Sequence, residues 1–527
     1  MGPDTIKGWR HRTPDTGHRT PDTGRPAVFG LAPDWLLEDG RPLATATVLS
    51  HPEQLERLRS ACPEAVPTAV LAGDPCYDRI LAALPQRDRF RRALGVGPGQ
   101  RLIVVSSTWA PRSLFGGAGA AEAGEPGADD LLPWLLSRLA TELPADEYRK
   151  TAVLHPNIWY GHGPGQVRAW LDNARRAGLE AIPPLDGWRQ SLIAADCVLG
   201  DHSSVTYYAA SMGIPVLLGA FPQEDLDPLS PVAALGRTAP GLLRRGSLRA
   251  QIDRAITSHN PSRYKELAEQ TSSSPGESAA LLRRLFYGLM DIPEPEGHPA
   301  LLEPLPLPPY LPARVTAPIR VLARQISSDP PELALVRYAV VGDEPDPSED
   351  TAALSEDPAA PVDTAHTVAD EETRETGRLR VADVVVRHAA GDDPRLGPPA
   401  VWTSEALDRY PYCGLVAYVD GPDRCVVRTR EGHLVRLSAA TEPDGRPDLC
   451  DPAVYASALY AWLASGQPLG DALPAITVRT GAAAHHVTVE LLPPSAPPSP
   501  PPAGSHASGS ASPVRIRSAP TRSPFAS

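Results

Sequence analysis

Lysine is almost absent from this 527-residue chain. It occurs only at Lys7, Lys150 and Lys265, and nearly all other basic residues are arginine. None of the three lysines follows a glycine and precedes a serine or threonine, so the sequence lacks the Gly-Lys-Ser/Thr of a phosphate-binding P-loop. GTPases and ATPases of that class are therefore excluded. The chain also lacks a Gly-x-Gly-x-x-Gly after its first expected strand, which disfavours an NAD-type oxidoreductase.

Cysteine is scarce as well. The six cysteines form no Cys-x-x-Cys pair and show no metal-ligand spacing. We therefore expect reduced thiols in the core, with no disulfide framework, no metal and no cofactor. The polar start lacks the apolar run of a signal peptide, and the longest uncharged stretch before the tail, 203–222, has the rhythm of a core segment. These features predict a cytoplasmic protein, free or peripheral to the inner face of the membrane, without an integral membrane segment.

A basic surface is also missing. The formal net charge is −13, and the segment from Asp343 to Glu372 holds a large share of it, because it has eleven carboxylates and no lysine or arginine before Arg374. The remainder of the chain is close to neutral. Nucleic-acid binding requires a basic face or stripe, and none is evident, so we expect no nucleic-acid partner.

Changes of composition divide the chain. The first 28 residues contain the heptapeptide HRTPDTG twice, at 11–17 and 18–24, and its prolines and glycines predict disorder. A proline-rich linker at 293–312, an acidic insertion at 343–376 and a Pro/Ser-rich tail at 493–527 are further breaks, and we expect the insertion and the tail to be disordered. Between these breaks, 68–292 and 313–492 are the two long candidate domains.

Short apolar runs, such as 68–72, alternate with helical patterns of about ten residues, such as 166–177, in the region 68–292. The run from Arg101 is of the fully buried kind that occupies the middle of a parallel sheet. This alternation predicts a Rossmann-like, doubly wound parallel sheet. The region 313–492 has long alternating or β-branched runs, at 315–325, 333–341 and 378–388, and one helix over 452–464. This pattern predicts a small α+β domain.

The segment from Pro184 to Phe221 contains a polar turn between a strand and a helix. The pattern predicts a strand over 196–199, a turn at 200–204, a helix over about 205–212 that ends at Gly213, and a strand over 215–218. A strand end that meets a helix N-terminus offers free backbone N–H groups and the positive end of the helix dipole to a phosphate. Helix capping by Asp201 and Ser203 is an equally good interpretation of the same residues.

Three polar motifs follow expected strands of this sheet, where ligands of open parallel sheets bind. A pyrophosphate requires hydroxyls, backbone amides and a cation or neutral imidazole. The candidate donor-binding residues are Ser107, Thr108, His155, Asp201, Ser203 and Ser204. A backbone-bonded structural histidine is the alternative at 155, and ordinary packing is favoured over base stacking for Trp109.

These motifs occur in an order that resembles a known family. GDPCYDR, SSTW, LHPN and AADCVLGDHSSVTYYAASMGIPVLL follow one another between about Thr47 and Phe221. Together they resemble the carboxyl-terminal, donor-binding half of CDP-glycerol glycerophosphotransferases of the wall teichoic acid type, in the GT-B glycosyltransferase-like superfamily, and most closely an actinobacterial group related to those enzymes. The resemblance implies a GT-B-type fold. It implies that His155 contacts the donor's pyrophosphate, that Ser203 and Ser204 hold the phosphates, and that Asp201 fixes the turn.

The chain also departs from the family. It has Tyr208 where family members carry an aspartate, and Ala110 where an arginine commonly follows Thr-Trp, although Arg112 is near. We expect 29–67 to be a remnant of the amino-terminal GT-B half; the family's catalytic histidine has no counterpart there, since His51 lacks its motif. The catalytic residues are thus unassigned.

Two functions remain open. One is a transferase that moves a group from a nucleotide-diphosphate-linked donor, CDP-glycerol or an NDP-sugar, to a polyol or glycan hydroxyl in cell-envelope polymer synthesis. The other is a catalytically incomplete nucleotide-binding or scaffold protein that keeps the donor-binding half.

Overall fold

The computed structural model describes residues 30–109, 112–115, 131–312, 314–341, 363–388, 397–441, 445–448, 450–470 and 473–493. The predicted disorder of 1–28, of most of the tail and of 343–362 lies outside the described residues. In the described ranges, no helix combines the length and apolar character needed to cross a membrane. All six cysteines are free, and five are buried, in keeping with the predicted core thiols.

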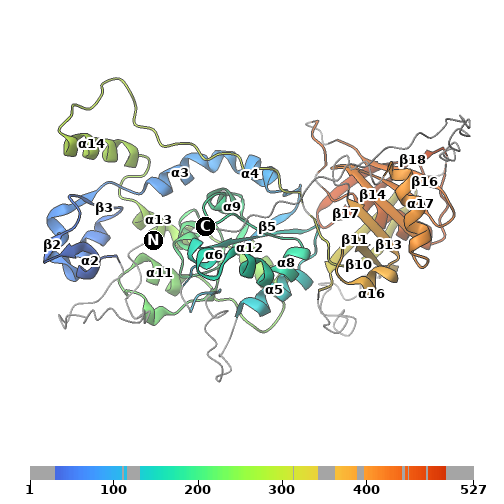
Figure 1. Cartoon of the computed structure of the whole chain (residues 1–527), viewed down its shortest axis with the longest axis horizontal. Helices are drawn as coiled ribbons and strands as arrows, with labels where there is room; N and C mark the ends of the chain where they lie inside the picture. The colour runs from blue at the N-terminus through green and yellow to red at the C-terminus, as the bar shows by residue number, and fades with distance from the viewer. Residues whose placement is uncertain are drawn as a thin grey trace, which may run out of the picture. The chain divides into compact units, whose positions relative to one another are not determined.

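A five-stranded parallel sheet forms the centre of the first large domain (Figure 1). Its order is β7-β6-β5-β8-β9, so the buried strand β5 lies in the middle, as predicted. The strands are β5 Arg101–Ser107, β6 Tyr148–Leu154, β7 Leu179–Ala181, β8 Cys197–Asp201 and β9 Val216–Ala220. Parallel neighbours require crossover connections, and helices supply them here.

Helices cover both faces of this sheet. Side chains alternate between faces along a strand, so Leu102 and Val104 belong to one hydrophobic cluster and Ile103 and Val105 to another. The first cluster includes side chains of α3 Pro75–Ala83, α4 Arg87–Ala93, α9 Trp188–Ala194, α10 Ser204–Ser211, α11 Pro231–Thr238 and α13 Lys265–Thr271. The second includes side chains of α5 Leu131–Thr141, α6 Pro156–His162, α7 Pro164–Trp170, α8 Asp172–Arg176 and α12 Leu248–Thr257. The doubly wound parallel sheet is therefore confirmed. The helix expected over 166–177 is two helices, α7 and α8, separated at Leu171.

The segment before this domain has a small core of its own. It contains α1 Pro33–Leu36, β1 Leu37–Glu38, β2 Arg41–Pro42, β3 Thr47–Leu49, α2 Pro52–Ala61, the 3-10 helix η1 Pro63–Thr68 and β4 Ala69–Leu71. Strand β4 pairs in parallel with β3 and not with the five-stranded sheet. The boundary predicted between 67 and 68 therefore divides a two-stranded sheet, and the correct break lies after β4. The apolar run at 68–72 predicted a strand but could not specify its partner. Beyond the sheet domain, α14 Ser278–Met290 precedes the proline-rich linker.

The second large domain is a closed β-barrel (Figure 1). Its order around the barrel is β10-β11-β17-β18-β16-β15-β14-β13-β12. The strands are β10 Ile319–Ser328, β11 Pro331–Ala339, β12 Thr364–Asp370, β13 Val384–His388, β14 Leu415–Gly421, β15 Arg424–Thr429, β16 Leu434–Ala439, β17 Ala475–Thr480 and β18 Ala483–Leu492. With its helices α16 Thr376–Arg380, α17 Pro399–Arg409 and α18 Ala453–Ala464, it makes the small α+β domain of the predicted fold class.

Helix α18 fills this barrel. It contacts most of the barrel strands, and its side chains share one hydrophobic cluster with inward-facing residues such as Val321 and Leu415. The helix is buried on nearly every side, from Ala453 to Trp462. A helix that is apolar all round is stable only inside a core, and the closed barrel provides that core.

Three expectations for this domain require correction. The acidic insertion predicted at 343–376 ends earlier, because Thr364–Asp370 is strand β12, paired with β10 and β13. The density of carboxylates obscured the inward side chains of this strand, His366 and Val368. The long β-run expected over 378–388 is the helix α16 followed by the short strand β13, and the helix α17 was not expected.

Candidate functional site

The three predicted motifs lie at one edge of the five-stranded sheet. Strands β6, β5 and β8 are neighbours, and His155, Thr108 and the 202–204 turn each follow the carboxyl end of one of them. The backbone N–H of His155 donates to the carbonyl of Ser107 over 3.0 Å. The topology thus brings together residues that are far apart in the sequence.

Asp201 is the structural centre of this edge. Its side chain is fully buried. Oδ2 accepts hydrogen bonds from the backbone N–H of Thr108 (2.9 Å), the hydroxyl of Ser107 (3.1 Å) and the N–H of Leu114 (3.2 Å). Oδ1 accepts the N–H of Ser203 over 3.1 Å. The carboxylate therefore fixes the turn, as expected, and also ties the end of β5 to the end of β8. Burial raises the pKa of Asp201, against the lowering effect of the adjacent His202 and these donors.

The turn leads into α10. Ser203 is the N-cap, and its Oγ accepts the N–H of Thr206 over 3.1 Å and contacts the hydroxyls of Thr206 and Ser106. Ser203 is 7% exposed, so its hydroxyl belongs to the interior of the turn. The capping interpretation is thus correct for Ser203, whereas Asp201 accepts the N–H of the N-cap residue itself and does not cap the helix. Ser204, in contrast, is exposed in the first turn of the helix.

Two glycines shape the helix–strand unit. A Cβ on Gly200 would lie 2.2 Å from Oγ1 of Thr206, so only glycine allows this close approach of β8 and α10. Gly213 has φ +76° just after the helix and its N–H bonds back to the carbonyl of Ala210, which confirms the predicted helix stop.

The polar groups at the end of β5 mostly form hydrogen bonds within the protein. Ser107 is 3% exposed, and besides its bond to Asp201 its Oγ accepts the N–H of Phe115 over 2.9 Å. Thr108 is partly exposed, and its carbonyl accepts from the hydroxyls of Ser107 and Ser113, both at 2.9 Å. Of these two predicted residues, Thr108 is the one with a side chain at the surface of the site.

His155 caps a second helix at this edge. Its Nδ1 accepts the N–H of Asn157, the second residue of α6, over 3.1 Å. A neutral imidazole that accepts at Nδ1 carries its proton on Nε2. Burial lowers the pKa of His155 and favours this neutral form. In the described part of the chain Nε2 has no hydrogen-bond partner, so its N–H remains available to a ligand. The Trp109 ring lies 6.4 Å from the imidazole.

His202 was not predicted as a site residue. It is 8% exposed, its Nδ1 is buried without a partner among the described residues, and its ring meets Phe221 edge-on at 6.2 Å. Burial lowers the pKa of His202, while the charge of Asp201 raises it. Its position in the Asp-x-Ser-Ser turn could have identified His202 as a site residue. The sequence pattern was applied only to its neighbours Asp201, Ser203 and Ser204.

The departures from the family pattern have structural roles. The hydroxyl of Tyr208 donates to Oδ2 of Asp74 over 2.6 Å and so ties α10 to the N-cap of α3. Arg112 forms ion pairs with Glu224 and Asp225. His51 is the N-cap of α2, where its Nδ1 accepts the N–H of Glu53 over 3.2 Å.

No protein-family model matches the sequence. No curated protein matches it either. Several solved structures show a partial likeness to this chain. A wall teichoic acid polymerase, TagF, is 15% identical, with a TM-score of 0.32, and the match covers 48% of this chain and 59% of that chain. The UDP-GlcNAc 2-epimerase of Neisseria meningitidis, bound to UDP-GlcNAc, is 13% identical, with a TM-score of 0.29 and coverages of 47% and 62%.

HepE of Anabaena, in complex with UDP and glucose, is 11% identical, with a TM-score of 0.25 and coverages of 47% and 64%. The matches thus span less than two thirds of these proteins. These likenesses, all with TM-scores below 0.5, carry no argument about the activity, substrate or partner of this chain. The GT-B-type resemblance and the narrower actinobacterial group both remain predictions.

Proposed function

We propose that the doubly wound domain binds a nucleotide-diphosphate-linked donor, CDP-glycerol or an NDP-sugar, at the carboxyl ends of β5, β6 and β8. The observation that supports this most strongly is a set of unused donors at one edge. The N–H groups of Ser204 and Val205 in the first turn of α10 have no hydrogen-bond partner among the described residues, and the Ser204 side chain is exposed. The Nε2–H of His155 is a further unused donor on the strand two places away.

These groups suit a diphosphate. The N-terminus of a helix carries partial positive charge and favours anions, and a neutral imidazole donates a hydrogen bond without adding a charge. Asp201 and Ser203 hold the turn that presents the amides, and neither side chain has to contact the ligand. The role suggested for Ser203 by the resemblance is thereby shifted to Ser204 and the backbone.

In a transfer reaction, the acceptor oxygen of a polyol or glycan forms a bond to the transferred group while the bond to the nucleotide breaks. Negative charge then develops on the phosphate oxygen of the leaving nucleotide. Donors already aimed at that oxygen stabilise the charge as it grows. We propose that His155 and the α10 amides have this role. The transfer itself would then be a step of cell-envelope polymer synthesis.

A second function has its own support. The segment expected to supply the acceptor side offers His51, and its Nδ1 is used to cap α2. Burial lowers the pKa of His51. A protein that binds the nucleotide without transfer, as a sensor or scaffold, fits this arrangement, because activation of an acceptor hydroxyl requires a positioned base.

Calorimetric titration of the purified chain with CDP-glycerol and with UDP-sugars tests the binding site. His155→Ala should weaken binding of the donor by about tenfold, the value of one hydrogen bond to a charged group. His162→Ala is the matched control, because His162 is an exposed histidine at the other end of the same helix, α6. Equal affinity in wild type and His155→Ala would overturn the assignment.

Nucleotide release separates the two functions. A transferase should release nucleotide from the bound donor faster when a polyol or oligosaccharide acceptor is added. A binding protein should show donor affinity with no acceptor-dependent release.

A further inference from the structure

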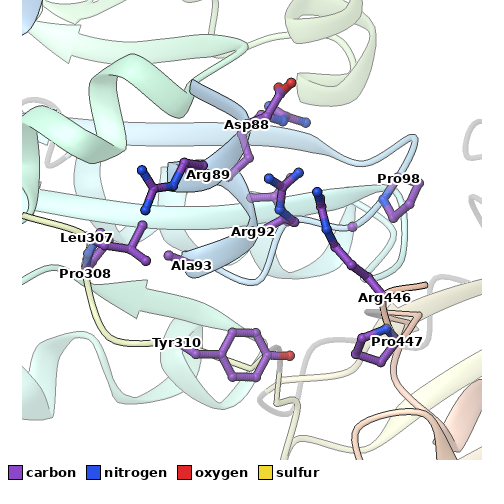
Figure 2. A pocket seen from close by; sticks show the side chains of 13 residues that line it. Asp88, Arg89, Arg92, Ala93, Pro98, Leu307, Pro308, Tyr310, Arg446 and Pro447 are labelled. Atoms are coloured by element: carbon purple, nitrogen blue, oxygen red, sulfur yellow. The ribbon is translucent and has the colours of Figure 1, made fainter. Parts of the chain in front are cut away.

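A cavity lined by both charged and apolar side chains lies away from the carboxyl edge of the sheet. It has a volume of about 680 Å³, within the range of small-molecule sites, and is lined by α4, by the turn at Gly97 and Pro98, by the proline-rich linker and by the short segment at 446–447 (Figure 2). The turn precedes β5, so the cavity is at the amino-terminal side of that strand. The donor site proposed above follows its other end.

The charge of this cavity is opposite to that of the chain. Its titratable lining consists of four arginines, Asp88 and Tyr310. Four positive charges and one negative charge give a formal net charge of +3, whereas the whole chain has −13. The four arginines are Arg89, Arg91, Arg92 and Arg446. Like charges gathered in one concave surface repel one another, and a bound anion relieves this repulsion.

The arginines differ in how far neighbouring groups neutralise or bind their guanidinium groups. Arg91 is tied down, because it pairs with Asp196 over 2.7 Å and donates to the carbonyls of Ala194 and Gln100. Asp196 is already shared with Arg87. Arg89 has one long hydrogen bond, of 3.4 Å, to the neutral side chain of Gln86.

Arg92 provides the main observation for the inference. It has neither an ion pair nor a hydrogen bond from its guanidinium to any described residue, although it is only partly exposed. Figure 2 shows the side chain of Arg446 extending toward Arg92 across the cavity. The guanidinium of Arg92 therefore has N–H groups available to an anion in the cavity.

The remaining wall is apolar and fixed to the sheet domain. Val96, Leu307, Pro308 and Pro447 line it, together with the half-exposed ring of Tyr310. The backbone N–H of Leu311 donates to the carbonyl of Ala93 at the end of α4 over 2.9 Å, which holds the linker against the helix. The cavity therefore combines a basic side with an apolar side, as small-molecule sites commonly do.

We propose that this cavity is a second binding site, for a small phosphorylated molecule with at least two negative charges. Arginine forks match the geometry of phosphate oxygens, and the apolar wall accommodates the carbon-containing part of such a ligand. The proposal does not depend on the donor site, since it uses none of the same residues.

Inorganic pyrophosphate is the probe, titrated into the full chain by calorimetry at low and high salt. Arg92→Gln should weaken its binding by about tenfold, and the effect should shrink as salt rises. Arg89→Gln, on an exposed side chain, is a second variant with little risk to folding and should also weaken binding. Arg168→Gln, which removes an exposed arginine from α7, is the charge-matched control and should leave binding unchanged.

Pyrophosphate also resembles part of the donor, so the two sites must be separated. In His155→Ala the arginine-dependent binding should persist, and in Arg92→Gln the affinity for CDP-glycerol should persist. The inference is overturned if Arg92→Gln and Arg168→Gln bind pyrophosphate equally, or if all binding is lost in His155→Ala. It is also overturned if citrate binds as tightly as pyrophosphate, because the site would then not select phosphate.

Discussion

Histidine 388 should make the barrel domain lose stability as the pH rises above neutrality. It lies at the end of β13, with Nδ1 3.0 Å from Asp370 and Nε2 3.5 Å from Asp451. Asp451 also pairs with the buried Arg337 over 2.9 Å, and Arg337 pairs with Asp146 over 2.7 Å. Burial alone lowers the pKa of His388, but its hydrogen bonds to the two carboxylates and their charges raise it to about 9.

The magnitude follows from linkage. In the unfolded chain a histidine titrates near its ordinary pKa of 6.5. A folded pKa of about 9 is thus higher by about 2.5 pH units, which corresponds to about 3 kcal/mol at 1.36 kcal/mol per unit. Because the folded pKa is raised, this contribution is fully present below pH 6.5 and is lost as the pH rises through 9. Most of the change should therefore occur between about pH 6 and pH 9.

Urea unfolding of wild type and of His388→Gln at a series of pH values measures this contribution as the difference between the two proteins. The difference should be about 3 kcal/mol at pH 6 and fall below about 1 kcal/mol at pH 9. Tryptophan fluorescence reports the barrel through Trp402 and Trp462, both buried there. His433→Gln, at a half-exposed histidine in the β15–β16 turn, is the matched control for the loss of an imidazole from this domain. A difference that stays constant with pH, or one that grows toward pH 9, would refute the reasoning.

Two further predictions concern the site edge. Gly200→Ala should lower the free energy of unfolding by about 2 kcal/mol or more, because the added Cβ would overlap the Thr206 side chain. The urea midpoint should therefore fall. An unchanged midpoint would show that α10 can move aside at no cost. Asp201→Asn should cost about 3 kcal/mol, because in either orientation the amide NH₂ would face a backbone N–H, that of Ser203 or those of Thr108 and Leu114. Hydrogen exchange should rise at one or more of these three amides, and unchanged protection at all three would contradict the role given to the carboxylate.

The sheet domain was predictable because its signals are local. The fully buried run from Arg101 to Ser107 predicts a central parallel strand, and the helices that follow each strand predict the crossovers. In such a topology the carboxyl ends of neighbouring parallel strands lie at one edge of the sheet. Polar motifs that follow these strands are therefore expected to meet there. The position of Gly213 likewise predicted the end of α10 correctly.

The barrel was less predictable because its pairing is not local. Strand β11 pairs in parallel with β17, which is more than a hundred residues away, and alternation along a strand does not identify its neighbour. The apolar character of 453–464 predicts a buried helix but not what encloses it. The many acidic residues around β12 favoured a prediction of disorder. His366 and Val368, however, are two residues apart and both buried, as residues on the inward face of a strand are.

The site illustrates a different limit. Serine and aspartate at a helix start serve as caps and as phosphate ligands with the same spacing, so the sequence could not separate these roles for Ser203 and Ser204. The structure distinguishes the two side chains by burial, because the first hydroxyl is inside the turn and the second is exposed. The same criterion distinguishes Ser107, which is internal, from Thr108, which is partly exposed.

The two proposed sites lie at opposite ends of one strand, and this constrains how they can influence each other. Strand β5 has seven residues, which at about 3.3 Å each separate its ends by about 23 Å. A ligand in the arginine-lined cavity therefore cannot touch a donor held after Ser107, and the two should not compete. Any effect of pyrophosphate in the cavity on CDP-glycerol affinity would have to pass through the sheet domain itself, and by linkage the donor would change pyrophosphate affinity by the same factor. Titration of each ligand in the presence of the other, in wild type and in Arg92→Gln, measures that factor, because only the effects of pyrophosphate that Arg92→Gln abolishes arise from the cavity. A value of one would mean that the sites bind independently.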